Sequence, residues 1–208
     1  MATDTRERIL DAAVAVLLRD GSKGLTTKAI AIEAGLTEPT LYIYFRTKFA
    51  LCIAVANERI PRQEDLARRI RSQAGTRTVL ENLRDQAGAV LRYFLASMPL
   101  EIMFWADPKL RLARHEFAPR PDLLSDAIAV YLDDEQSSGR VPQRVPLRGV
   151  AEGMVGTLFR RAFVITFSET TLSCEDATPI LDEVTDLASA ALCLDPVTSG
   201  SESLAGAG

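Results

Sequence analysis

The chain has 208 residues, of which 47% are apolar and 25% are charged, and its formal net charge is −4. This composition excludes a mainly disordered protein, and the longest uninterrupted apolar run, Phe49 to Ala56, is far shorter than the ~20 residues that span a bilayer. The three cysteines show no Cys-x-x-Cys spacing and the N-terminus has no signal-peptide pattern, so we expect a cytoplasmic protein with no metal, no cofactor and no membrane partner.

Charge divides unevenly along the chain. Residues 1–50 carry seven Lys/Arg against six Asp/Glu, whereas residues 51–208 carry 17 against 22. Between Lys23 and Lys48 there are four bases and two acids. This asymmetry is mild, and on charge alone an ordinary solvated surface explains it better than a nucleic-acid interface does.

The first third of the chain predicts several helices of modest length. Apolar residues recur at helical spacing from Ile9 to Leu17, and Gly21 follows that run, where a cap with positive φ is expected. A short helix over residues 27–34 is closed by Gly35. A second short helix over residues 38–45 is opened by Thr37 as N-cap, with Glu38 and Pro39 in its first turn. A third run begins at Lys48 and continues to about residue 72, with a break or kink at Pro61.

Longer amphipathic segments follow. An apolar stripe over residues 79–98 ends at Pro99, and residues 100–118 are helical but punctuated by Pro108. Further helices are expected over 121–138, 147–167 and 180–192, and residues 196–208 form a tail of disordered composition. We therefore predict an all-α fold of about nine helices, a three-helix N-terminal head with a helix-turn-helix followed by a larger helical bundle. The expected domains are residues 1–48 and 49–195.

The two short helices around Gly35 have the spacing of a helix-turn-helix. The second one hides Leu41 and Phe45 and leaves its other side for DNA, because an α-helix just fits the major groove. Tyr42, Tyr44 and Lys48 can reach phosphate oxygens. The side chains expected on the open side are Thr37, Glu38, Pro39, Thr40, Tyr42, Ile43 and Tyr44.

The stretch GLTTKAIAIEAGLTEPTLYIYFRTKFAL, residues 24–51, resembles the DNA-binding signature of the TetR family of bacterial repressors. The resemblance is strong over residues 6–56, and beyond them it rests on helix number and length. It implies that Tyr42 contacts a phosphate and that Lys48 lies near the DNA backbone. The candidate DNA-binding residues are Thr26, Thr27, Lys28, Thr37, Glu38, Pro39, Thr40, Tyr42, Ile43, Tyr44 and Lys48.

Two of these positions depart from the family's pattern. Tyr44 stands where histidine is frequent, which keeps a hydrogen-bonding ring but loses an imidazolium charge. Glu38 stands where lysine is common. It either accepts from a cytosine amino group or only favours the helix N-terminus through the dipole, and the dipole is the simpler explanation.

Aromatic and methionine side chains gather in the second domain. Most such residues in a helical bundle are core, but the resemblance implies a ligand cavity among its helices, so some of them are expected to line it. We predict an apolar or aromatic small-molecule ligand. The candidate ligand-binding residues are Tyr93, Phe94, Met98, Met103, Phe104, Trp105, Phe117, Phe159 and Phe163.

Gly149, Gly153 and Gly156 lie on one predicted helix, where each glycine costs ~1 kcal/mol relative to alanine. They indicate close approach of another helix, either within the chain or across a homodimer formed by the last two helices, which the resemblance also implies. The sequence thus predicts a dimeric, ligand-responsive repressor of a pseudo-palindromic, double-stranded DNA operator. The alternatives are a helical enzyme, for which no catalytic constellation is visible, and a protein-interaction bundle without sequence-specific DNA binding.

Overall fold

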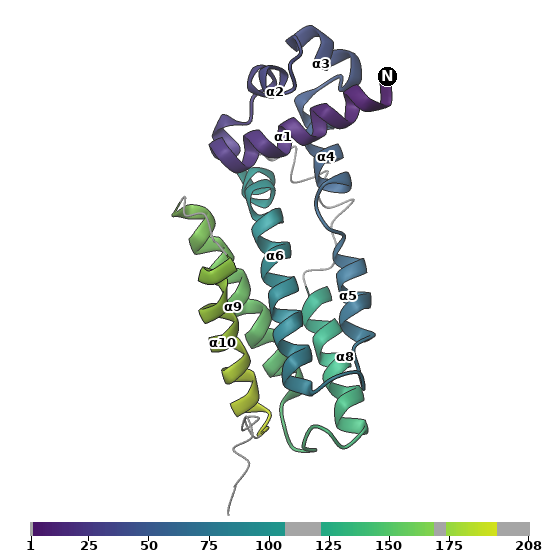
Figure 1. Ribbon diagram of the computed structural model, residues 1–208, viewed down its shortest axis with the longest axis vertical. Coiled ribbons are helices and arrows are strands. Elements are labelled where there is room, and N and C mark those ends of the chain that lie inside the picture. The colour runs from purple at the N-terminus through teal and green to yellow at the C-terminus, as the bar shows by residue number, and fades with distance from the viewer. Residues whose placement is uncertain (1, 107–121, 169–173, 195–208) are drawn as a thin grey trace, which may run out of the picture.

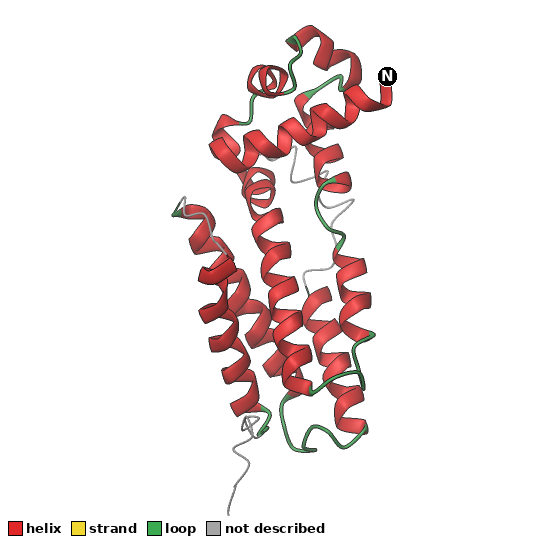
Figure 2. Ribbon diagram, viewed as in Figure 1, coloured by secondary structure: helices red, strands yellow, loops and turns green. Residues whose placement is uncertain are grey.

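The computed structural model describes residues 2–106, 122–168 and 174–194. Every regular element in these ranges is a helix, as Figure 2 shows, which confirms the predicted all-α fold of a head followed by a bundle. The helices of this part of the chain are α1 (Ala2–Gly24), α2 (Thr27–Glu33), α3 (Glu38–Tyr44), α4 (Lys48–Glu58), α5 (Gln63–Arg71), α6 (Val79–Ala106), α8 (Leu123–Ser137), α9 (Leu147–Phe167) and α10 (Cys174–Ala191).

The head at one end of the molecule consists of α1, α2 and α3, with α4 leading away from it (Figure 1). Threonine side chains cap α2, α3 and α4: Thr26 accepts from the amide of residue 29, Thr37 from that of residue 40, and Thr47 from that of residue 50. Gly35, between α2 and α3, has a φ of 64°, and Gly21 interrupts α1 with a φ of 65°. Gly21 therefore adopts the positive φ that the sequence predicts there, and the positive φ of Gly35 fits its predicted place at the end of the first short helix.

The body is built around α6, which runs from the far end of the molecule up to the head (Figure 1). In that view α9 and α10 lie to one side of α6, and α5 and α8 lie to the other. Leu83, Ile128, Tyr131 and Leu158 are among the fully buried side chains of the body's hydrophobic cluster. Within the described part of the chain α6 is also the one helix long and apolar enough to cross a membrane, over Val79–Trp105, but it is mostly buried as the body's central core helix.

Proline decides two helix boundaries in opposite ways. At Pro61 the predicted run from residue 48 to 72 is broken, because α4 ends at Glu58 and α5 begins at Gln63. At Pro99 the predicted end is wrong, because α6 continues through this proline to Ala106. A proline inside a helix costs about 3 kcal/mol, whereas burying one large apolar side chain returns about 1.5–3 kcal/mol. The turns beyond Pro99 bury Leu100, Met103 and Phe104, which outweighs that cost.

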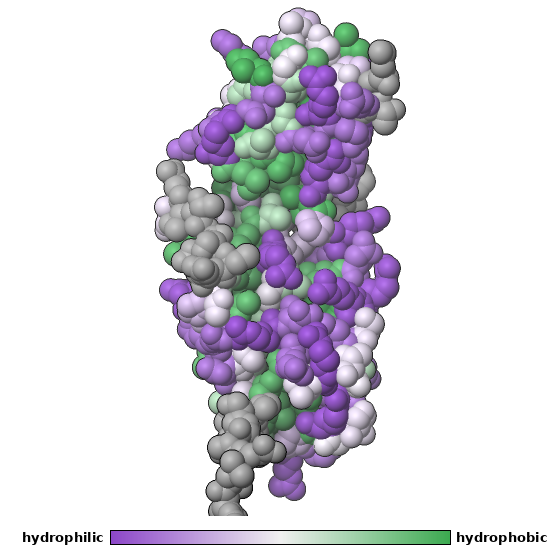
Figure 3. Space-filling model, in the orientation of Figure 1, coloured by the Kyte–Doolittle hydropathy of each residue, from purple (hydrophilic) through white to green (hydrophobic). Residues whose placement is uncertain are grey.

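The upper end of α6 is part of the head's own core. Leu100, Met103 and Phe104 belong to the same cluster of buried residues as Ile9, Leu41 and Val55. Cys52 of α4 lies in this cluster with its Sγ 3.8 Å from the Sδ of Met103, and burial raises the pKa of its thiol to about 11. On the face shown in Figure 3, hydrophobic residues gather at the level where α6 meets the head. Because α4 and α6 both contribute to the head cluster, the domain limits 1–48 and 49–195 stay a prediction.

Ion pairs tie α1 to the end of α4. The guanidinium of Arg6 donates to both carboxylate oxygens of Glu58, at 2.7 and 2.6 Å. Arg59 donates to Glu7 at 2.5 Å and to Asp11 at 2.7 Å. These bonds connect the first helix of the head with the residues at which the chain leaves it.

Candidate functional site

Helix α3 has one buried side and one exposed side. Its buried side is Leu41, which with Phe45 just after the helix packs into the head core. On the other side Ile43 is 78% exposed and Tyr42 is exposed as well. Tyr44 differs from the expectation of an open position, because it is half-buried against the head core. Helix α3 thus presents a short ridge to solvent while one large side chain anchors it.

The hydroxyl groups at the starts of α2 and α3 are already engaged in the free protein. Thr26 accepts from the amide of Ala29 at 3.1 Å, and Thr37 accepts from the amide of Thr40 at 3.4 Å. The hydroxyls of Thr37 and Thr40 are 2.8 Å apart and hydrogen-bonded to each other. These caps fix the two helix N-termini, whose free amides favour an anion such as phosphate.

A side-chain cluster joins α2 to α3. The Thr27 hydroxyl donates to the carboxylate of Glu38, and the Tyr42 hydroxyl donates to the Thr27 oxygen at 3.5 Å. These residues are far apart in the sequence, so no local pattern predicts the contact. The three side chains nevertheless all belong to the predicted DNA-binding set, and the structure brings them together.

Exposed basic residues occur on α2, at the start of α4 and in the connection between α3 and α4. Lys28 lies on α2, and Lys48 is the first residue of α4. Arg46, in the connection between α3 and α4, is also exposed, although the sequence prediction did not include it. Its signal was present in the group of four bases between Lys23 and Lys48. The turn between α2 and α3 is bonded to α1, because Arg8 of α1 donates to the carbonyl oxygen of Ala34 at 2.6 Å.

These residues give the head an exposed side of α3, hydroxyl groups, helix N-termini and three exposed cations. Such a surface suits the groove and phosphates of a duplex. In residues 2–106, 122–168 and 174–194 there is no group of three or more His, Cys, Asp or Glu that could hold a metal ion.

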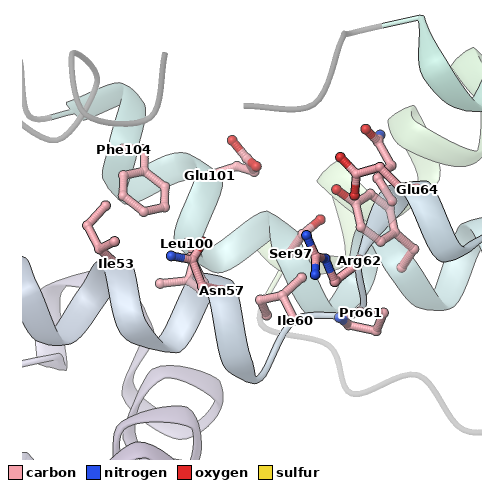
Figure 4. A pocket seen from close by; sticks show the side chains of 13 residues that line it. Ile53, Asn57, Ile60, Pro61, Arg62, Glu64, Ser97, Leu100, Glu101 and Phe104 are labelled. Atoms are coloured by element: carbon pink, nitrogen blue, oxygen red, sulfur yellow. The ribbon is translucent and has the colours of Figure 1, made fainter. Parts of the chain in front are cut away.

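A cavity of about 330 Å³ lies beneath the head. It is bounded by α4, the connection to α5, the first turn of α5 and the upper half of α6 (Figure 4). Ile53 and Phe104 lie at one end of it, and Arg62, Ser97 and Glu64 lie toward the other. Its remaining lining residues are Ala56, Asn57, Ile60, Pro61, Gln63, Tyr93, Leu100 and Glu101.

The predicted ligand-binding residues are dispersed. Tyr93 and Phe104 line the cavity. Met98 is buried in the body core and Met103 in the head core, whereas Trp105 is 74% exposed. Phe94 contacts Phe159 edge to face at 5.4 Å between ring centroids, Phe163 lies exposed on α9, and Phe117 lies outside the described residues. Gln63, Asn57 and Ser97 line the cavity but carry no periodicity signal that distinguishes them in the sequence.

Comparison with known proteins agrees with this geometry. The family profile of "Bacterial regulatory proteins, tetR family" matches residues 9–55. Tetracycline repressor protein class D of Escherichia coli is 34% identical over 93 residues, which cover 45% of this chain and 43% of that protein. The class H tetracycline repressor of Photobacterium damsela subsp. piscicida matches to the same extent. The chain therefore matches less than half the length of these curated relatives.

Solved structures extend the likeness from the head to nearly the whole chain. A TetR-like transcriptional regulator from Rhodococcus sp. RHA1 aligns with a TM-score of 0.61 at 19% identity, covering 88% of this chain and 93% of that one. The regulator FadR from Bacillus subtilis, solved in complex with stearoyl-CoA, aligns with a TM-score of 0.57 at 20% identity, covering 88% and 96%. At these identities the structures establish the fold, and the head carries the sequence relationship. The head of this chain, residues 9–55, is thus similar in sequence to the TetR family of bacterial regulatory proteins, and the rest of the chain shares the fold of these solved structures.

Proposed function

We propose that this protein is a DNA-binding transcriptional repressor. The observation that carries the proposal is the exposed side of α3, anchored by Leu41, together with the exposed bases Lys28, Arg46 and Lys48 on the neighbouring segments of the chain. A helix presented in this way enters the major groove, while cations and helix N-termini on both sides hold the phosphates.

The predicted contact residues divide into two roles. In this proposal the DNA phosphates are contacted by Tyr42, Lys48 and Lys28. These contacts contribute to affinity without reading the DNA sequence. The side chains at the N-terminal end of α3, with Ile43 on its exposed face, meet base edges and set the preferred sequence. We add Arg46 to the residues proposed to contact phosphates, because its side chain is exposed.

The protein acts as a homodimer in this proposal, so that two copies of α3 meet the two halves of a pseudo-palindromic operator. The support is an apolar face on α9. An added Cβ at Gly153 or Gly156 meets no atom within 4 Å, so these glycines do not serve a close contact within the chain. Phe163 and Phe167 are exposed further along the same helix, and Leu187 is exposed on α10.

A small molecule releases the repressor in this proposal. The cavity beneath the head touches α4 and the upper end of α6, both of which contribute side chains to the head core. A ligand that binds one arrangement of these helices better than another shifts the population of heads competent for DNA. Coupling between ligand and DNA must then be reciprocal.

The test is selection of a binding sequence from random duplex DNA by the full chain without added ligand. Fluorescence anisotropy then compares the selected duplex with a scrambled duplex of equal length and composition. We expect a two-fold symmetric consensus and clear preference for it, with affinity that falls steeply as salt rises. Equal binding to both duplexes would contradict the proposal and leave an interaction bundle or an enzyme as the better explanation.

A further inference from the structure

The cavity beneath the head contains an unsatisfied polar group. Gln63, the first residue of α5, lines the cavity and is only 8% exposed. Its side-chain oxygen is buried and accepts no hydrogen bond. A buried polar atom without a partner is costly in a folded protein, and such groups are rare unless water or a ligand satisfies them.

The most deeply buried side chains that line the cavity are uncharged. Of the charged lining residues, Arg62 and Glu64 are exposed, and Glu101 is half-buried and already has an interaction of its own. Gln63, Ser97 and Leu100 are buried. Figure 4 places Ile53 and Phe104 at the end opposite Arg62 and Glu64. A charged group that entered the buried part would find no opposite charge among these inner residues, which makes its desolvation unfavourable. A neutral hydrogen-bonding group is compatible with that environment.

The size of the cavity limits its occupant. At ~30 Å³ for each water-sized group, the volume of about 330 Å³ holds on the order of ten non-hydrogen atoms. We propose that this cavity binds a small neutral molecule, with an apolar part between Ile53 and Phe104 and an amide or hydroxyl group that hydrogen-bonds to Gln63. The terminal torsion of a glutamine side chain is soft, so its carboxamide can turn toward either a donor or an acceptor. This inference gives the chemistry of the effector and rests on the proposed function for its regulatory meaning.

The ligand chemistry is tested with three compounds that share a phenyl ring and a short side chain. Phenylacetamide is neutral, phenylacetate is anionic and phenethylammonium is cationic. Binding to the full chain without DNA is measured by isothermal titration and by ligand-observed NMR. We expect phenylacetamide to bind at millimolar concentration or below, about fivefold more tightly than either charged compound, as for one net hydrogen bond.

The variant Gln63→Leu assigns the preference to this side chain. It should weaken phenylacetamide binding about fivefold and leave the charged compounds unchanged, because an apolar side chain of similar size fills the position. Its melting temperature should equal or exceed that of the wild type, since an unpaired buried polar atom is removed. Gln143→Leu, in the exposed connection between α8 and α9, is the matched control and should bind like the wild type. Should Gln63→Leu fail to fold, Ser97→Ala takes its place, because Ser97 is another buried polar residue that lines the cavity.

Two results would overturn the inference. One is tightest binding of phenylacetate with loss of that binding in Arg62→Gln, which would make the rim arginine the recognising group. The other is no binding of any compound at millimolar concentration. A chain that selects an operator but shows either result keeps the proposed function and loses this inference. If the chain binds phenylacetamide through Gln63 but prefers no DNA sequence, the ligand inference stands and the proposed function is wrong.

Discussion

Glu38 places a negative charge on the surface proposed to face DNA. Its carboxylate accepts from the Thr27 hydroxyl, which in turn accepts from Tyr42 at 3.5 Å. The sequence left two roles open for Glu38, a base contact and a favourable position at the helix N-terminus. The structure adds a third, because the carboxylate links α2 to α3 and holds the hydroxyls of Thr27 and Tyr42 close together. A residue engaged in this way has less freedom to reach a base edge.

Loss of a phosphate contact should weaken all DNA binding to a similar degree. Tyr42→Phe and Lys48→Ala should each cost on the order of 1 kcal/mol for both the selected and the scrambled duplex, with more for the lysine because it is charged. Lys48→Ala should also lower the slope of log affinity against log salt by about one unit per subunit. Fluorescence anisotropy over a series of salt concentrations measures both quantities.

Arg144→Ala is the control for that experiment. Arg144 is an exposed base between α8 and α9, which Figure 1 places at the end of the molecule away from the head. This variant should keep both the affinity and the salt slope of the wild type. An unchanged slope in Lys48→Ala would rule out the phosphate role of Lys48.

Glu38→Gln separates the charge of this side chain from its hydrogen bond. The amide oxygen of glutamine still accepts from Thr27, whereas repulsion between the carboxylate and DNA phosphates disappears. We expect tighter binding to scrambled DNA, by up to about 1 kcal/mol, and an unchanged consensus sequence. Repeating the selection from random DNA with the variant tests this. A consensus that loses one C·G pair would instead show that Glu38 reads cytosine.

Among the helices, α4 and α6 have a double role, because each contributes to the head core and also bounds the cavity. Helix α4 is held to α1 by Arg6–Glu58 and by the bonds from Arg59, and α6 reaches the head only because it continues through Pro99. Movement of either helix must therefore disturb side chains that pack behind α3. This arrangement provides a physical connection between the cavity and the DNA-binding surface.

The Arg6–Glu58 pair makes stability depend on acid pH. The hydrogen bonds from Arg6 hold the pKa of Glu58 below its usual range, so the folded protein favours the carboxylate. The resulting stabilisation is present above the unfolded pKa of about 4.3 and is lost as pH falls through the lower folded pKa. Between about pH 5 and pH 3, Arg6→Gln should therefore lose less free energy of unfolding than the wild type. The difference should not exceed about 1 kcal/mol, because the pair is partly exposed.

Urea unfolding at a series of pH values measures this difference. Arg144→Gln removes an exposed arginine that makes no contact with Glu58, and its stability should follow the wild type across the range. If the free energy of unfolding falls equally in Arg6→Gln and in the wild type as the pH is lowered, the Arg6–Glu58 pair is not the cause of the pH dependence.

At the scale of the whole molecule, the described surface leaves an apolar face on α9 uncovered. The open glycines at 153 and 156 continue into the exposed rings of Phe159, Phe163 and Phe167. An exposed apolar patch of this kind marks an interaction site on a soluble protein. A second copy of the same helix is the proposed partner, because small residues allow two helices to approach closely.

Gly153→Arg tests the dimer without disturbing the fold. No atom lies within 4 Å of a Cβ at this position, so the variant chain should retain its helical circular dichroism. Across a dimer interface the new charge would be buried without a partner, at a cost of about 3 kcal/mol or more. Analytical ultracentrifugation at micromolar concentration should find a dimeric wild type and a monomeric variant. Gln143→Arg, in an exposed connection, should remain dimeric, and a monomeric wild type would contradict the proposal.

Much of the head could be predicted because its signals are local. Thr37 caps α3 and Gly35 follows the end of α2 as expected, since a cap needs only the next three residues and a turn only its own backbone. Most of the open side of α3 followed from a single periodicity with Leu41 buried. The half-buried Tyr44 did not, because its ring packs against residues of the head core that periodicity within seven residues does not reveal.

The amino-acid sequence by itself determined the helical class, the helix-turn-helix and the likeness of the head to the TetR family, because apolar periodicity, caps and turn glycines act within a few residues of each other. Only the tertiary structure decided that α6 crosses Pro99, that Thr27 meets Glu38, and that Gln63 lines a cavity. Each of these depends on side chains brought together from distant parts of the chain. Burial energy gathered over several such residues outweighs the local preference of any one of them.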